Sequence, residues 1–314
     1  MTVARGWLDS IFGGASDSGA NAAAEQPVDW STAVVPSGLD SVFTEATYAL
    51  NEALAGTDGG RKMLSVDILT PGLSPRLEQK AALLQEYLFD SIIRALLPAL
   101  TAHYGKTMLC FQSIGDAASF RKHVTQNRID LRQGRDDIIL GDVDVERITG
   151  DVECCVFVTT KQHIGDPVLQ ELEKISTTFP RLDMVFYNCD LSDKVTTGIQ
   201  ARAARDSYRS MIKPAFYFRN LVEVSRPSLV PSEVGAMVYT PTSGWCIYAA
   251  MAEDVSGPGS LNRFMLQGVF KRSREDCSAA RPPRFARLGS FESMPRGEEL
   301  QRCLAKGEFL QRRR

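Results

Sequence analysis

The residues best suited to acid–base chemistry lie together in the segment KQHIGD. Lys161, His163 and Asp166 combine a cation, an imidazole that titrates near neutral pH and a carboxylate, a set that can move a proton next to a bound small molecule. The other interpretation is a structural turn, with His163 in solvent and Asp166 capping the next helix. The loop has the single glycine Gly165, and neither G-x-G-x-x-G nor G-x-x-x-x-G-K-[ST] occurs in the chain, which favours the turn.

The elements around this loop predict where it lies. An apolar run of strand length, 152–159, precedes it, and Asp166 with Pro167 forms an N-cap and first-turn pair. The strand-like run LDMVFYNCDL comes after the helix, so the unit is a β-α-β crossover. The loop therefore follows the carboxyl end of a strand, where ligands bind in open α/β sheets. The buried stripe of the helix is expected to be Val168, Leu169, Leu172 and Ile175.

Metal binding and covalent catalysis find no support in the sequence. The cysteines lack metal-finger spacing, and adjacent Cys154 and Cys155 would point to opposite faces of a strand. No G-x-S-x-G elbow occurs. The acidic segment RDDIILGDVDVE lacks the glycine and final glutamate of a calcium loop, so we interpret it as a solvated linker. We expect no metal, no cofactor and buried structural cysteines at Cys110, Cys154, Cys155, Cys189 and Cys246.

Both ends of the chain and one turn are candidates for contact with a partner. An apolar cluster at helical spacing precedes the Gly-, Ala- and Ser-rich stretch 13–38, and it is either an anchor or a frayed terminus. The segment 272–314 holds eleven Lys/Arg and six Asp/Glu. In the turn YTPTSGW the aromatic rings either cover the end of a sheet or form a contact patch. The candidate partner-binding residues are Trp7, Leu8, Ile11, Phe12, Tyr239, Trp245, Arg312, Arg313 and Arg314.

The order of the predicted elements indicates the fold. A helix over 39–55 is followed by the strand KMLSVDIL, a long helical segment with Pro98 as a kink or end, the strand TMLCFQS and a helix over 116–127. After the crossover come FYFRNLVEV, GAMVYT, GWCIYAAMA and RFMLQGVF, with PTSG as a hairpin turn. We predict an α/β, Rossmann-like layered sheet with helices on its faces and an antiparallel C-terminal extension. The predicted division is 1–38 extension and linker, 39–283 single domain and 284–314 basic tail.

Composition excludes some function classes. The chain has 314 residues, 44% hydrophobic and 24% charged, with a formal net charge of −2, so a polyanion-binding surface over the whole molecule is not expected. RNA binding through the arginine-rich tail would rest on charge alone, and we expect no nucleic-acid partner. The sequence contains no apolar run long enough to predict a membrane-spanning helix.

Several segments occur together in an order that resembles a known family. They are TEATYALNEALAG, VDILTPGL, DVECCVFVTT, YNCDL and YTPTSGW. Over about Leu39 to Pro283 they resemble an uncharacterised domain family of cyanobacteria, algae and plants. That family includes the assembly factor called low photosystem II accumulation three and the C-terminal domain of a plant chloroplast adenylate kinase. The resemblance implies a chloroplast protein on the stromal side of the thylakoid membrane and carries no agreed catalytic site.

The expected function is therefore that of a non-catalytic chloroplast protein. It would dock peripherally on a thylakoid photosystem complex as an assembly factor or auxiliary subunit, with protein–protein contacts at its termini and the YTPTSGW turn. Its basic residues could meet an acidic protein face or anionic lipid. The alternative is a stromal enzyme that binds a nucleotide or small molecule with the loop 161–166.

Overall fold

The computed structural model describes residues 39–56, 60–69, 88–129, 138–158, 166–189, 203, 206–207, 210–224, 231–250, 285–295, 298–300 and 302–303. The chain divides into two compact units, one formed by residues 40–217 and the other containing residues 218–314. The limits 39 and 283 for one domain stay a prediction. The candidate site residues of the loop 161–166 belong by sequence to the first unit.

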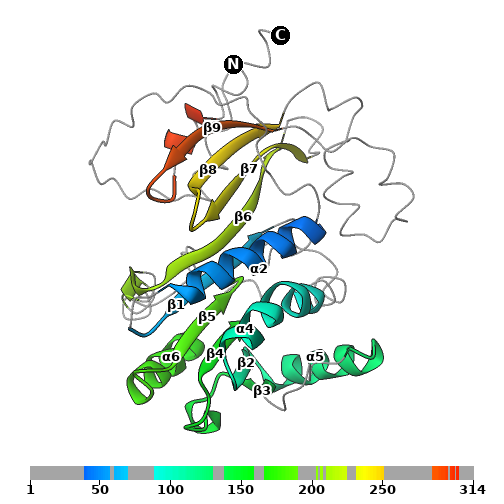
Figure 1. The fold of residues 1–314 in the computed structure, drawn as a ribbon, viewed down its shortest axis with the longest axis vertical. Helices are drawn as coiled ribbons and strands as arrows, with labels where there is room; N and C mark the ends of the chain where they lie inside the picture. Colours follow the sequence, from blue (N-terminus) through cyan, green and yellow to red (C-terminus); the bar gives the residue numbers. More distant parts are fainter. Residues whose placement is uncertain are drawn as a thin grey trace. The chain divides into compact units, whose positions relative to one another are not determined.

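The first unit is built on a parallel sheet (Figure 1). Its strands stand in the order β3-β2-β4-β5-β1, and the pairs β2–β3, β2–β4, β4–β5 and β1–β5 are all parallel. Because the central strands are covered on both faces, they read as continuous apolar runs rather than alternating ones. The strands are β1 Met63–Leu69, β2 Thr107–Phe111, β3 Ile138–Asp142, β4 Cys154–Val158 and β5 Asp183–Tyr187.

Helices cover both faces of this sheet, which confirms the predicted layered α/β class. On one face, Phe120 lies 5.4 Å from Phe111 between ring centroids. On the other face, Leu172 and Ile175 pack in one buried cluster with Phe157. The helices are α2 Leu39–Ala55, a π-helical turn Ile92–Leu96, α4 Leu97–His103, α5 Ile114–Gln126 and α6 Asp166–Thr178.

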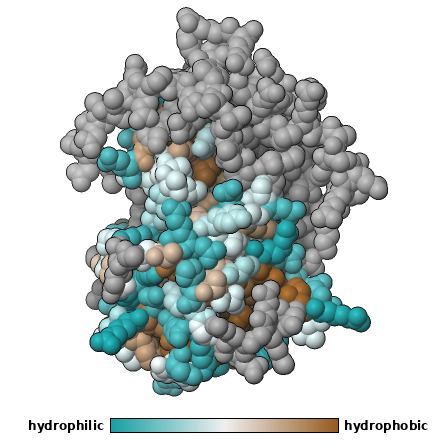
Figure 2. Space-filling view, viewed as in Figure 1, coloured by the Kyte–Doolittle hydropathy of each residue, from teal (hydrophilic) through white to brown (hydrophobic). Residues whose placement is uncertain are grey.

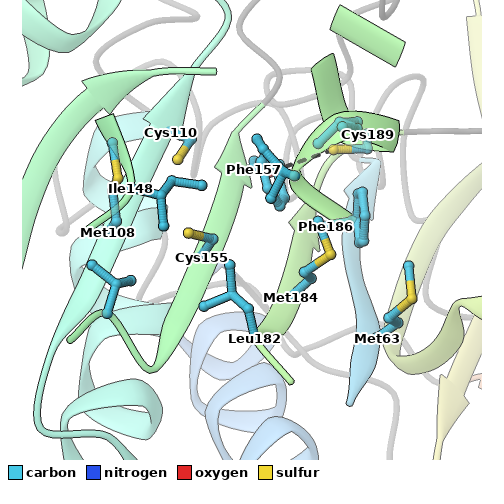
Figure 3. Packing of buried hydrophobic residues seen from close by; sticks show 13 residues of the cluster. Met63, Met108, Cys110, Ile148, Cys155, Phe157, Leu182, Met184, Phe186 and Cys189 are labelled. Atoms are coloured by element: carbon cyan, nitrogen blue, oxygen red, sulfur yellow. Dashed lines mark hydrogen bonds between the residues drawn. The ribbon is translucent and has the colours of Figure 1, made fainter. Parts of the chain in front are cut away.

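The core under α6 is rich in sulfur (Figure 3). Thioethers and thiols pack among the aromatic and aliphatic side chains of this buried cluster, where soft unbranched side chains adapt to irregular gaps. Phe157 and Phe186 stack with ring centroids 5.3 Å apart. The sulfur-bearing residues of this cluster are Met63, Met108, Cys110, Cys155, Met184 and Cys189.

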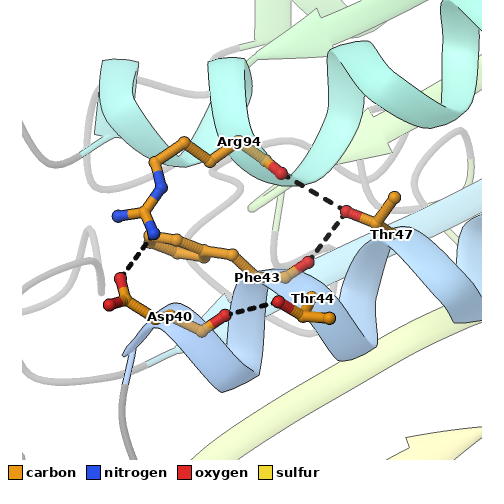
Figure 4. Close-up of polar contacts among 5 residues, drawn as sticks. All are labelled: Asp40, Phe43, Thr44, Thr47 and Arg94. Atoms are coloured by element: carbon orange, nitrogen blue, oxygen red, sulfur yellow. Dashed lines mark hydrogen bonds and ion pairs between the residues drawn. The ribbon is translucent and has the colours of Figure 1, made fainter.

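Pro98 does not end the helical segment, which was one alternative of the prediction, because α4 runs on to His103; the irregularity lies just before the proline. The chain makes a π-helical turn, in which the Leu97 N–H bonds to the Ile92 carbonyl, and Pro98 then lies in the first turn of α4. Proline has no N–H to give the carbonyl four residues earlier, which is that of Arg94. Thr47 of α2 contacts this turn: its Oγ1 lies 3.3 Å from the Arg94 carbonyl oxygen (Figure 4) and 3.1 Å from that of Ala95.

The interpretation of RDDIILGDVDVE as a solvated linker is wrong for its central part. Residues Ile138–Asp142 form the edge strand β3, paired in register with β2, and Val145–Arg147 form a short 3₁₀ turn. An edge strand is paired on one side only and can be short, so its sequence need not contain a long apolar run. The three apolar residues of β3, which lie between acids, are therefore a weak strand signal. The pairing partner, distant in sequence, decides the outcome.

The antiparallel extension is also confirmed. Strand β6, Lys213–Val224, begins in the first unit and continues into the second. Strands β7, Pro231–Thr240, and β8, Gly244–Ala250, form the predicted hairpin, and β9, Phe285–Phe291, pairs antiparallel with β8. Strand β9 was not predicted. The predicted strand RFMLQGVF lies outside the described residues.

Candidate functional site at the carboxyl edge of the parallel sheet

The carboxyl ends of β2 and β4 form a topological switch point. The chain leaves β2 toward β3 and leaves β4 toward β5, which lie in opposite directions along the sheet. The connecting helices α5 and α6 pack on opposite faces, through Phe120 and Leu172 respectively. In open α/β sheets this divergence opens a crevice beyond the strand ends, where ligands bind.

The predicted loop follows β4 at this switch point. Residues 159–165, with Lys161 and His163, lie outside the described residues, and for Asp166 only the backbone is described, as the first residue of α6. Helix α6 begins at Asp166, the residue predicted to be its cap, so Pro167 lies in the first turn as predicted. Whether Lys161, His163 and Asp166 act on a ligand stays a prediction.

The residues that follow β2 already have polar partners. Ser113 has an extended backbone and caps α5: its Oγ accepts from the Asp116 N–H at 3.3 Å and donates to the Asp116 carboxylate at 2.7 Å. A carboxylate in the first turn takes the place that an anion would occupy at this helix terminus. This end of the sheet is therefore unsuited to a phosphate group at α5.

The carboxyl end of β5 holds a buried polar group that the sequence did not single out. Asn188 is fully buried and has φ 50°, in the left-handed region. Its N–H donates to the Val66 carbonyl at 3.0 Å, while its side-chain Oδ1 accepts from the Ile68 N–H at 2.6 Å. The side chain thus continues the β1–β5 ladder at the point where the backbone turns out of it.

Two buried side-chain atoms of the described residues lack a hydrogen-bond partner, Asn188 Nδ2 and Asp142 Oδ1. Asp142 is the last residue of β3, and its Oδ1 lies 2.8 Å from Arg147 Nε in an ion pair whose geometry does not make a hydrogen bond. Both atoms lie at carboxyl ends of the parallel strands. Buried polar atoms without partners are rare in folded proteins, and each calls for an explanation such as strain, a functional role, or a bound water or ion.

A family model described as a domain of unknown function, DUF1995, matches residues 36–258. The chain belongs to the DUF1995 family. That the chain is a member of an uncharacterised domain family is thereby confirmed. No curated protein and no solved structure was found to match the chain.

At the amino edge of the parallel sheet of the DUF1995 domain, charged side chains bind the backbone and side chains of neighbouring strand ends. The Asp183 carboxylate accepts from the Lys62 N–H at 2.7 Å and from the Tyr104 hydroxyl at 2.7 Å. Glu153 accepts from the Gly105 N–H at 2.6 Å, and Lys106 pairs with Asp151. Burial is the first cause that raises the pKa of Tyr104 well above its ordinary value. These contacts join the amino ends of β1, β2, β4 and β5.

The thiols of the DUF1995 domain are structural in the part of the chain that the structure describes. The five cysteines predicted to be buried are all buried. A hydrogen bond with Cys155 and burial raise the pKa of the Cys110 thiol, and burial raises that of Cys154, so neither forms the thiolate that nucleophilic catalysis requires. Cys110 pairs with Phe157, and Cys155 with Met108, so the two cysteines are diagonal neighbours on one face of the sheet. Both are free thiols.

The two described histidines lie near helix ends. His103 is in the last turn of α4. His123 lies in the last turn of α5, where its Nε2 is 2.9 Å from Asp90 Oδ1 and its ring lies 5.5 Å from that of Phe89 between centroids. This pair connects α5 to the helix before α4.

The partner candidates divide between described and undescribed residues. Tyr239 and Trp245 pack together with ring centroids 4.9 Å apart, and Trp245 is 7% exposed, so its ring mainly covers the hairpin. Trp7, Leu8, Ile11, Phe12 and Arg312, Arg313 and Arg314 lie outside the described residues. Contact of any of them with a partner stays a prediction.

The described surface is mostly hydrophilic on the face drawn in Figure 2, with small hydrophobic areas. Large exposed apolar side chains of the described residues are Tyr48, Ile114 and Met211, on separate elements. Within those residues, no group of three or more His, Cys, Asp or Glu side chains could hold a metal ion. The helices of the described part are too short or too polar to cross a membrane.

Proposed function

We propose that the chain is a non-catalytic chloroplast protein that docks peripherally on a thylakoid photosystem complex, from the stromal side, as an assembly factor or auxiliary subunit. The observation that carries this proposal is the unlike character of the two ends, an apolar cluster at 7–12 and a basic segment ending in Arg312, Arg313 and Arg314. A weak apolar contact and an electrostatic one together give attachment that neither gives alone. The family resemblance supplies the setting.

Truncation of each end tests this proposal. Removal of residues 1–30 is expected to release the protein from isolated thylakoids, and the substitution of Arg312, Arg313 and Arg314 by Gln is expected to make binding weaker and less dependent on salt. The matched control deletes 14–26, within the linker, and keeps the apolar cluster. Undiminished membrane association of both altered forms, or a pull-down without photosystem subunits, would refute the docking proposal.

A second candidate function is favoured by the switch point between β2 and β4. The alternative is a stromal enzyme that binds a nucleotide or another small molecule at the carboxyl edge of the sheet, with Lys161, His163 and Asp166 beside the ligand. Asn188 Nδ2, which is buried and has no hydrogen-bond partner, lies at the same edge of the sheet and supports this candidate. Calorimetric titration with AMP, ADP and GMP, compared between wild type and His163→Ala, tests this candidate. Equal affinity in the two proteins would exclude the loop.

A further inference from the structure

Helix α5 packs on the parallel sheet through one face and keeps the opposite face in solvent. It contacts β2 and β3, and the buried residues of its inner face are Ala117 and Phe120. At 3.6 residues per turn, the outer face is a stripe that follows the helix axis. The exposed residues of this stripe are Ile114, Ala118, Arg121, Lys122 and Thr125.

This outer face has an apolar start, a basic centre and no acid. Ile114 is 57% exposed, which makes it one of the large apolar side chains that the described surface leaves in solvent. The one acid of α5, Asp116, accepts a hydrogen bond from the cap residue Ser113 and so belongs to the start of the helix. Arg121 and Lys122 therefore have no carboxylate of their own helix beside them.

The cations of α5 also differ from those of other elements in having no counter-charge. Among the described residues, Arg121, Lys122 and Arg128, which follows α5, form no ion pair. A cation without a counter-charge can pair with a carboxylate of another protein without first breaking a contact within its own chain. The ion pairs formed by cations elsewhere include Arg94–Asp40, Lys106–Asp151, Arg147–Asp142 and Lys174–Glu171.

The other long helices of the first unit do not present a basic face. Helix α2 contains no Lys or Arg and exposes Asp40 and Glu52. Helix α6 exposes Glu173 beside Lys174, and Lys174 is already paired with Glu171. An uneven distribution of charge orients a protein as it approaches a charged partner. The distribution on these helices would turn α5 toward an anionic surface.

The number and placement of the cations favour an acidic protein over an anionic lipid surface. Attachment to anionic lipid is typical of clusters of about four to eight Lys/Arg, and an amphipathic helix adds an apolar face that enters the bilayer. The described cations of α5 and its C-terminal turn are Arg121, Lys122 and Arg128, and its apolar face is already used in the core through Phe120. Ile114 alone suits contact with a side chain of a protein.

We propose that the outer face of α5 is a docking surface for an acidic face of a protein partner. Arg121 and Lys122 pair with carboxylates of that partner, and Ile114 contacts an apolar side chain roughly 10 Å further along the helix, from a rise of 1.5 Å per residue. The inference rests on the proposed function, peripheral docking on a thylakoid complex. It adds a contact on the folded domain to those at the two ends of the chain.

The test compares binding of the full chain to isolated thylakoids at low and at high salt. Arg121→Gln with Lys122→Gln removes both cations and keeps the helix propensity. We expect this variant to bind about fivefold more weakly at low salt and to differ little from wild type at high salt. The matched control, Lys174→Gln with Arg181→Gln, removes the same charge from exposed positions on α6 and the turn after it, and we expect it to bind like wild type. Equal thermal midpoints show that the variants keep the fold.

Two further measurements decide between protein and lipid as the partner. Vesicles of phosphatidylglycerol and phosphatidylcholine in equal parts should bind wild type and the α5 variant equally. Thylakoids whose surface proteins have been trimmed by protease should no longer distinguish the two proteins. If the variant loses as much binding to the vesicles as to thylakoids, or if trimming leaves the difference intact, the partner is anionic lipid and the inference is overturned.

The outcomes also separate this inference from the function on which it rests. If the α5 variant binds thylakoids like wild type while removal of residues 1–30 releases the protein, peripheral docking stands and the α5 surface fails. If the control variant loses as much binding as the α5 variant, net charge rather than α5 determines attachment, and the inference fails again. If wild type does not bind thylakoids at all, both the inference and the proposed function fail.

Discussion

Removing the hydroxyl of Thr47 tests whether a side chain of α2 compensates for Pro98. The single hydroxyl proton of Thr47 is within reach of three carbonyls, at 2.9 Å from Phe43, 3.1 Å from Ala95 and 3.3 Å from Arg94 (Figure 4). Thr47→Val keeps the shape of the side chain and its helix propensity. The variant loses about 1 kcal/mol for the hydrogen bond and up to about 1 kcal/mol more for a carbonyl left without a donor.

The assay is urea unfolding of the full chain, and the expected loss of unfolding free energy is about 1–2 kcal/mol with an unchanged slope. Thr44→Val is the matched control, because Thr44 lies on the same helix and donates only to the Asp40 carbonyl of its own helix, at an exposed position. We expect that control to change stability by less than about 0.5 kcal/mol.

The role of Pro98 is isolated by a double-mutant cycle. In Pro98→Ala the new N–H can bond to the Arg94 carbonyl, so Thr47→Val should then cost about 0.5 kcal/mol or less. If Thr47→Val costs the same in both backgrounds, Thr47 does not compensate for the proline. If it costs no more than Thr44→Val in either, the contact between α2 and the π-helical turn contributes nothing measurable.

Two further predictions follow from a buried phenol and a strained turn. Tyr187 is fully buried, its hydroxyl donates to Ser91 at 2.5 Å, and burial raises its pKa. The stability that this raised pKa contributes is complete below pH 10, the ordinary pKa of tyrosine. As the pH rises above 10, the unfolding free energy falls by about 1.4 kcal/mol per pH unit. Tyr187→Phe should therefore be less stable by about 1 kcal/mol at pH 7 and should lose stability less steeply than wild type above about pH 10; parallel curves of unfolding free energy against pH would contradict this. Gly244 starts β8 with φ 65°, and a Cβ at this position would lie 3.4 Å from the Phe291 carbonyl oxygen. Gly244→Ala should therefore lower the unfolding free energy of the second unit by about 1–2 kcal/mol. A thermal midpoint equal to that of wild type would show that the turn relaxes without strain.

The parts of the fold that the sequence predicts are those with strong local patterns. Strands β2, β4 and β5 are apolar runs, α5 lies within two residues of the helix predicted over 116–127, and the YTPTSGW turn joins β7 to β8. Strand β3 escapes prediction because its three apolar residues lie between acids, and its pairing with β2 is a tertiary effect. The position of β4 between β2 and β5 cannot be read from local pattern either, because strand order depends on contacts between distant segments.

The candidate site likewise has features that follow from local sequence and features that depend on contacts between distant segments. Chain order alone places the loop 161–166 after a strand, and the strand order then places it at a switch point. Asn188 gave no signal as a candidate, since an asparagine after an apolar run is also a common turn residue. Its significance depends on a left-handed backbone and on a bond to Ile68 across the sheet, and both are properties of the folded chain.

The two edges of the parallel sheet differ in how they use polar groups, and this difference supports a function at one of them. At the amino edge, Asp183 and Glu153 accept from backbone N–H groups and from Tyr104, so these groups fasten strand ends. At the carboxyl edge, Asn188 Nδ2 is buried without a hydrogen bond, whereas Asp142 Oδ1 is ion-paired with Arg147 at 2.8 Å. Because an unpaired buried amide group lowers the stability of the fold by about 1–3 kcal/mol, the Asn188 side chain is the group at this edge that a bound molecule would stabilise. A bound molecule that raises the thermal midpoint of wild type more than that of Asn188→Asp would confirm this argument, and equal shifts would contradict it.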